Sequence, residues 1–148
     1  MQIIDYKIER LQELKTVLNK DNESLQTACK SAEIKNKWFT QTNIWQAINA
    51  IKIQFLDADK LRNWLNGYNI KPITKKVGII LAGNIPLVGF HDILCAFVLN
   101  VPTRVKLSKD EVLMKFIIQE LKRIDITWDA EIVEKLTDYD AVIGTVKQ

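Results

Sequence analysis

The residues best placed to do chemistry lie in a turn that follows an apolar run. The run is Val77-Gly78-Ile79-Ile80-Leu81-Ala82, and Gly83-Asn84-Ile85-Pro86-Leu87-Val88-Gly89 comes after it. In an open α/β sheet, ligands bind beyond the carboxyl ends of the strands, so this turn is the expected site. The Asn84 side chain could donate an amide N–H that stabilises an oxyanion in the cleft. Alternatively, Asn84 caps the following helix, with Pro86 near its first helical position.

A second group of polar residues ends the next expected strand, about twenty residues after the glycine turn. Its sequence is Arg104-Val105-Lys106-Leu107-Ser108. In dinucleotide-binding folds an acidic residue at this place binds the ribose 2′-hydroxyl, whereas a cation accommodates a 2′-phosphate. Lys106 therefore favours NADP over NAD, with Arg104 and Lys109 nearby. Two other readings stay open: Glu111 could reach a ribose hydroxyl, and Lys106 could be a solvated residue at the rim of the sheet.

Metal and thiol chemistry find little support in the sequence. His91 is the single histidine, and Cys29 and Cys95 are far apart, so no multi-histidine or paired-cysteine metal site is expected. Two lone cysteines favour a reducing compartment over a disulfide framework. We expect Cys95 to lie inside an apolar helix with a protonated thiol, and Cys29 to be more exposed.

The composition is that of one globular domain. The chain has 148 residues, of which 47% are hydrophobic and 26% charged, and a net charge of +3. This charge is too small and too scattered to predict a nucleic-acid partner. The longest apolar run, 93–99, is too short to cross a bilayer, and the charged first ten residues do not resemble a signal peptide. We therefore expect a soluble, cytoplasmic protein with no membrane span.

The first part of the chain, residues 1–70, predicts helices only. Apolar residues recur at steps of three and four residues after Ile4 and again after Ile44. Asp57 is expected to cap a short helix whose inward face includes Trp64.

The remaining residues, 71–148, alternate between strand and helix patterns. We expect Ser108 and Glu111 to form a capping box for the helix through 113–124. The pattern predicts an α/β fold in which N-terminal helices precede a partial, Rossmann-like parallel sheet. The last strand leaves an apolar face or edge uncovered, so the chain either pairs with a second copy, as a homo-oligomer, or has lost its second half. The expected elements are a strand at 77–82 buried on both faces, a helix at 90–99, a strand at 104–107, a helix through 113–124, and strands at 131–133 and 141–145.

The segment from Lys76 to Asp92, with its Ala-Gly-Asn-Ile-Pro-Leu-Val-Gly-Phe-His-Asp stretch, resembles the signature of bacterial acyl-CoA reductases of the luminescence (LuxC) type. These are distant members of the aldehyde dehydrogenase superfamily. The segment 105–108 resembles the family's second-strand motif, which reads Lys-Pro-Ser-Glu in aldehyde dehydrogenases. The segments 38–43 and 138–143 also resemble family segments, so the likeness spans nearly the whole chain.

The resemblance implies an NADPH-dependent reduction of a fatty acyl-CoA to an aldehyde through a thioester on a catalytic cysteine. Asn84 matches the asparagine that helps to hold the thioester oxyanion, and it follows Gly83 of the cofactor turn. Lys106 and Ser108 match the strand end that binds the adenosine ribose. The matching cysteine belongs to a later domain that continues beyond the last strand, and neither Cys29 nor Cys95 corresponds to it.

Two functional interpretations follow. In the first, residues 1–70 form a helical N-terminal region and 71–148 a partial dinucleotide-binding domain of an acyl-CoA reductase, catalytically incomplete alone. Long-chain acyl-CoA is then a partner only once the missing domain is supplied, and NADP binding is weak or absent. In the second, the chain is a stand-alone nucleotide-binding or protein-interaction module without catalysis.

Overall fold

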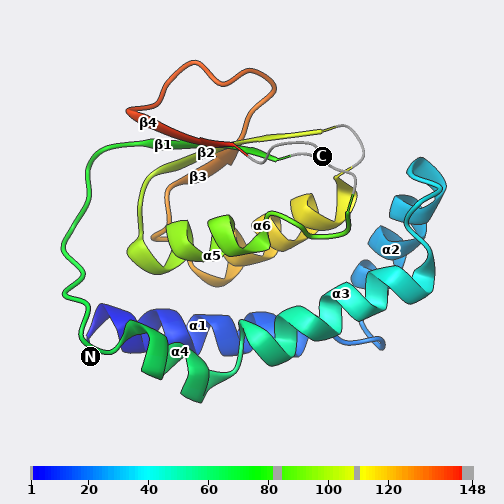
Figure 1. Cartoon of the computed structure of the whole chain (residues 1–148), viewed down its shortest axis with the longest axis horizontal. Coiled ribbons are helices and arrows are strands. Elements are labelled where there is room, and N and C mark those ends of the chain that lie inside the picture. Colours follow the sequence, from blue (N-terminus) through cyan, green and yellow to red (C-terminus); the bar gives the residue numbers. More distant parts are fainter. Residues whose placement is uncertain (1, 82–84, 109–110, 145–148) are drawn as a thin grey trace.

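The computed structural model describes residues 2–81, 85–108 and 111–144. It stacks one parallel sheet on two layers of helices: α5 and α6 lie directly against the sheet, and α1, α3 and α4 lie beyond them (Figure 1). The elements are α1 (Ile3–Val17), α2 (Glu23–Lys35), α3 (Gln41–Gln54), α4 (Ala58–Leu65), β1 (Val77–Leu81), α5 (Phe90–Leu99), β2 (Thr103–Leu107), α6 (Val112–Ile124), β3 (Ala130–Ile132) and β4 (Ala141–Gly144).

Capping residues fix where the first helices begin. The side chains of Asn22, Thr40 and Asp57 each accept a backbone N–H from the first turn of α2, α3 and α4. The expected cap at Asp57 is therefore confirmed. The expected inward position of Trp64 is wrong: its side chain is 37% exposed, because Leu61 and Leu65 take the buried positions of this short helix.

The sheet is parallel throughout, as the alternation of strands and helices predicted. Its strand order is β3-β2-β1-β4, so the chain builds outward from β1 to β3 and then returns to the other side of β1. The returning segment, 133–140, crosses the face of the sheet that α5 and α6 do not cover (Figure 1). Leu136 of this segment lies over Gly78 of β1.

The two faces of β1 differ in burial. Ile79, on the helix side, is fully buried, whereas Ile80, on the other side, is 40% exposed. The expectation that this strand is buried on both faces is therefore wrong at Ile80. The segment that crosses this face carries no helix, and it covers Gly78 but leaves Ile80 in contact with solvent.

The starts of α5 and α6 also differ from expectation. The N-cap residue of α5 is Gly89, so the expectation that Pro86 lies near the first helical position is wrong, and Asn84, the expected cap, lies outside the described residues. The N-cap residue of α6 is Glu111, whose side chain makes no capping hydrogen bond to the first turn, so the predicted capping box with Ser108 as the cap is wrong too. Glu111 is only 4% exposed.

One hydrophobic core joins the helical first half to the α/β second half. Leu11 of α1 and Ile48 of α3 belong to the same buried cluster as Phe97 of α5 and Ile117 of α6. The helices of the first half therefore bury the faces of α5 and α6 that point away from the sheet.

Candidate functional site

The strand order places a topological switch point at the carboxyl ends of β1 and β4. These two strands are hydrogen-bonded neighbours, yet the connection after β1 leads to α5 on one face of the sheet, while β4 is reached across the other face. The connection that follows β1 and the connection that leads to β4 therefore lie on opposite faces of the sheet. A divergence of this kind, outside the carboxyl ends of parallel strands, is the usual place for a nucleotide in a doubly wound sheet.

The turn after β1 is described from Ile85 onward, and the predicted site residues Gly83 and Asn84 lie outside the described residues. The described part of the turn is anchored by Leu87, which is 5% exposed and has a left-handed backbone with φ of +60°. This conformation is costly for a residue with a Cβ, by about 1–3 kcal/mol, and persists only where packing enforces it. Burial of the Leu87 side chain supplies that packing.

Gly89 brings the end of this turn close to β1. A Cβ at Gly89 would collide with the side chain of Leu81, which is itself buried. Neither the burial of Leu87 nor the close approach at Gly89 was predicted from the sequence. The one feature of the sequence that indicates this close approach to Leu81 is a glycine, Gly89, directly before an apolar helix.

The two predicted cofactor residues at the carboxyl end of β2, Lys106 and Ser108, are both exposed. Lys106 lies opposite Ile80 in the register of β1 and β2, on the sheet face away from the helices, and is exposed. Ser108 is also exposed and lines a groove beside α6. Within the described part of the chain, the Lys106 ammonium group makes no ion pair, so its charge is available to an anionic ligand.

Arg104 is not available in the same way, although it lies on the same face. Its guanidinium donates to Asp129 at 3.1 Å and to the backbone oxygen of Thr103 at 2.9 Å. The Glu131 carboxylate lies 3.6 Å from its Nε. Lys106 is therefore the better candidate of the two to meet a ribose phosphate.

The cysteines are poor nucleophiles. Cys29 is 1% exposed, and burial raises its pKa to about 11, so the expectation that Cys29 is the more exposed cysteine is wrong. It faces the contact between α2 and the rest of the core rather than solvent. Cys95 is half-buried, and burial, together with the charge of Asp92, raises the pKa of its thiol.

His91 lies one helical turn before Cys95 and contacts its thiol. Its ring nitrogens lie 3.8 and 3.9 Å from the sulfur. The other side of the ring packs against Phe55 and Trp64, with centroid distances of 5.5 and 5.8 Å. These contacts give His91 a packing role, and no group of three or more metal-ligating side chains occurs in the described ranges.

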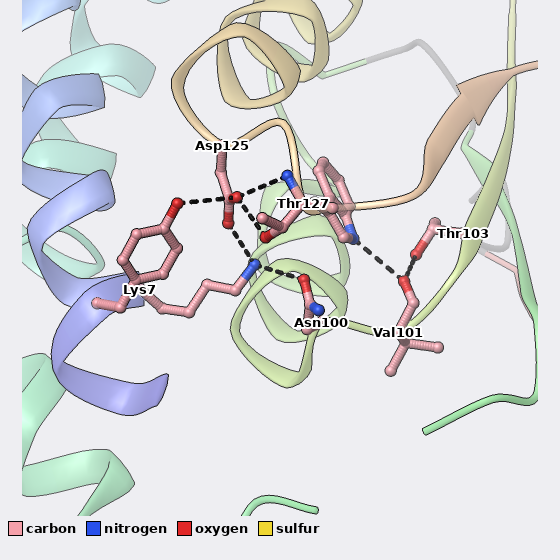
Figure 2. Close-up of polar contacts among 8 residues, drawn as sticks. Lys7, Asn100, Val101, Thr103, Asp125 and Thr127 are labelled. Carbon is pink, nitrogen blue, oxygen red and sulfur yellow. Dashed lines mark hydrogen bonds and ion pairs between the residues drawn. The ribbon is translucent and has the colours of Figure 1, made fainter. Parts of the chain in front are cut away.

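A buried polar cluster lies at the opposite end of the sheet, near the amino ends of β2 and β3. Lys7 of α1 donates to Asp125, which follows α6, at 2.6 Å and to Asn100, which follows α5, at 2.7 Å (Figure 2). Backbone N–H and side-chain donors of Thr127 also reach Asp125. The Lys7 ammonium lies 4.1 Å from the centre of the Phe97 ring.

The pKa values of this cluster follow from its burial and its hydrogen bonds. Burial lowers the pKa of Lys7, although the hydrogen bond to Asp125 opposes this. Burial alone would raise the pKa of Asp125, but the hydrogen bonds from Lys7 and Thr127 outweigh it and hold that pKa below its usual value. Neither Lys7 nor Asp125 was predicted from the sequence to be buried. Lys7 stands at helical spacing between Ile4 and Leu11, within the apolar stripe of α1, and this position is the feature of the sequence that indicates its burial.

Comparisons of this chain with protein-family models, with curated proteins and with solved structures found no match. Among the described helices, none has the length and apolar character needed to span a membrane.

Proposed function

We propose that this chain is the amino-terminal portion of an NADPH-dependent fatty acyl-CoA reductase and that it forms one side of the cofactor crevice. The observation that carries the proposal is the strand order β3-β2-β1-β4, with connections that diverge between β1 and β4. This order is that of the first half of a doubly wound dinucleotide-binding domain. The resemblance of the turn and of the β2 end to LuxC-type reductases supports the particular activity.

The residues at the crevice fit a phosphorylated dinucleotide. The exposed ammonium of Lys106 has no ion-pair partner within the described residues, and it suits the 2′-phosphate that distinguishes NADP from NAD. Ser108 offers a hydroxyl to the adenosine ribose. NADPH, when bound, supplies the hydride that reduces an acyl thioester to the aldehyde. In this proposal, Gly83 lets the backbone approach the cofactor, and the Asn84 amide donates to the thioester oxyanion.

The nucleophile must come from elsewhere. The pKa values of Cys29 and Cys95 are both raised, and a thiol must be deprotonated to attack an acyl carbonyl. The chain alone should therefore show no acyl-CoA reductase activity and only weak NADP binding. NADPH oxidation in the presence of a long-chain acyl-CoA, abolished by Cys95→Ser, would contradict this.

The experiment that tests cofactor choice is a fluorescence titration with NADPH and with NADH. We expect NADPH to bind more tightly to the wild type and Lys106→Glu to remove this preference. Lys75→Glu makes the same charge change on an exposed residue before the amino end of β1, and it should keep the preference. Equal affinities for the two cofactors in all three proteins would overturn the proposed role of Lys106.

A protein-interaction module remains the second candidate, because all four residues of β4 are exposed. The opposite edge strand, β3, has three residues and carries the charge of Glu131, whereas β4 reads Ala-Val-Ile-Gly. An uncharged edge with unpaired backbone groups favours strand addition. A second copy could pair its own β4 in antiparallel fashion about a twofold axis. Light scattering should then find a dimer that Val142→Lys converts to a monomer, and a monomeric wild type would exclude it.

A further inference from the structure

Two strongly exposed apolar side chains lie at the end of α2 and in the turn that follows it. Ile34, in the last turn of α2, is 84% exposed, and Trp38, in the following turn, is 73% exposed. Trp64, the next most exposed tryptophan, is only 37% exposed. This turn lies at one end of the longest axis of the molecule, where it projects from the fold (Figure 1). Apolar side chains gathered on a projecting surface indicate a contact with another body.

The exposed position of Trp38 is built into its turn. The backbone N–H of Trp38 donates to the Asn36 side chain at 3.0 Å, and the backbone N–H of Phe39 donates to the backbone oxygen of Asn36 at 2.9 Å. The next side chain, Phe39, is 1% exposed and anchors the turn in the core. Within the described residues, the indole N–H of Trp38 makes no hydrogen bond. The fold therefore holds a tryptophan outward with its polar group free for an outside acceptor.

Three exposed lysines accompany these two side chains: Lys30, Lys35 and Lys37. None of their ammonium groups makes a hydrogen bond or ion pair within the part of the chain that the structure describes. The carboxylate of this segment is Glu33, which accepts a hydrogen bond from the Gln41 amide at 2.7 Å and keeps its charge. Residues 30–40 therefore carry a net charge of +2, from three lysines and one glutamate. We call Ile34, Trp38 and the three lysines the α2 tip.

The shape and chemistry of the α2 tip favour a lipid bilayer over a protein partner. A stable protein interface buries about 800 Å² on each partner, and a projecting turn with two apolar side chains falls well short of that. A bilayer, in contrast, closes around a projecting side chain whatever its shape. Tryptophan is enriched at the membrane–water interface, where its ring lies among the headgroups and its N–H finds an acceptor, and lysines there attract anionic lipids.

We propose that the α2 tip docks the chain on an anionic phospholipid surface, with Trp38 and Ile34 inserted at the level of the headgroups and the lysines facing lipid phosphates and carboxylates. The contact is peripheral, and no helix crosses the bilayer. This inference does not rest on the proposed reductase function, since it uses none of the residues assigned to the cofactor or to the thioester.

The probe is a set of sucrose-loaded vesicles of phosphatidylcholine, with and without phosphatidylserine, that are sedimented after mixing with the chain at low ionic strength. We expect saturable binding to the vesicles that contain phosphatidylserine, at least about tenfold weaker binding to pure phosphatidylcholine, and weaker binding as salt rises. Trp38→Ser should weaken binding at least about tenfold, because it removes the inserted ring. Lys30→Gln/Lys37→Gln should also weaken it at least about tenfold, because it removes two charges that face the lipid.

Two control variants make the same kinds of change elsewhere on the surface. Tyr68→Ser removes an aromatic side chain that is 64% exposed, and Lys71→Gln/Lys75→Gln removes two exposed lysines. All three residues belong to the segment between α4 and β1, at the opposite end of the longest axis (Figure 1). Both controls should bind vesicles as the wild type does. Thermal unfolding of every variant checks that the fold is retained.

Four results would overturn the proposal: no binding to vesicles with phosphatidylserine, equal binding to both kinds of vesicle, no effect of Trp38→Ser, or equal weakening by the two pairs of lysine substitutions. The last result would assign the binding to the net charge of the whole chain. A dimer that Trp38→Ser dissociates, in a chain that binds no vesicles, would instead assign the α2 tip to a second copy. None of these measurements involves a nucleotide, so this proposal and the cofactor proposal can fail separately.

Discussion

The ammonium nitrogen of Lys7 lies 2.6 Å from Oδ2 of Asp125, and the two side chains are 1% and 0% exposed. These residues are 118 positions apart in the sequence. Through them α1 is joined to the segment that follows α6, and Asn100 extends the contact to the segment that follows α5 (Figure 2). The helical first half and the α/β second half are therefore joined by a buried ion pair as well as by apolar packing.

We predict that Lys7→Met lowers the free energy of unfolding by about 3–5 kcal/mol, because it leaves the Asp125 carboxylate buried without its cation. Urea denaturation followed by circular dichroism measures this. The control Lys15→Met removes a lysine of the same helix that has no ion-pair partner among the described residues. It should change stability by less than about 0.5 kcal/mol. Equal effects of the two substitutions would show that the ion pair contributes no more than a surface charge.

We predict that acidification weakens the fold through Asp125. Its pKa in the folded state lies below the ordinary value of 3.8, so its contribution to stability is present above that value and is lost as the pH falls through the lower, folded-state pKa. Urea denaturation between about pH 6 and about pH 3 measures the loss. Asp125→Asn lacks this titration and should show a shallower decline with pH. A decline as steep as that of the wild type would assign the acid sensitivity to other carboxylates.

We predict that Gly89→Ala destabilises the protein by about 1–3 kcal/mol, because the added methyl group has no room beside Leu81. Gly144→Ala is the matched control, since nothing lies within 4 Å of a Cβ at that position. The shift in thermal midpoint measured by calorimetry should be large for the first variant and small for the second. An unchanged midpoint for Gly89→Ala would show that the turn can relax around the methyl group.

We predict that both thiols react slowly with a disulfide reagent at about pH 8, and Cys29 most slowly, because its pKa of about 11 and its burial leave almost no accessible thiolate. Time courses of the single variants Cys29→Ala and Cys95→Ala separate the two thiols. The same proteins in urea should react rapidly. A native Cys29 that reacts as fast as the unfolded one would contradict its placement in the core.

The sequence predicted the local elements well because their signals are local. The apolar stripe of α1, the cap at Asp57 and the apolar helix at Phe90–Leu99 each depend on residues within one or two turns, and the structure contains all three. The parallel pairing of the sheet also followed from the alternation of strands and helices.

Features set by long-range packing were harder to predict. The burial of Cys29 depends on how α2 packs against α6, which its neighbours in sequence do not specify. The exposure of Ile80 arises because the segment before β4 crosses the sheet without a helix. The partnership of Lys7 with Asp125 required two distant segments to meet, and only the position of Lys7 within an apolar stripe hinted at it.

The most direct test of the proposed cofactor crevice is a titration of the isotopically labelled protein with NADPH, followed by amide chemical shifts in NMR spectra. We predict shifts that saturate and that concentrate at the carboxyl ends of β1, β2 and β4, at Leu81, Ile85, Ser108 and Gly144. We predict little change at the amino ends, around Thr103 and Ala130. Saturating shifts confined to the amino ends, or none at all with NADPH in excess, would contradict a nucleotide site between β1 and β4.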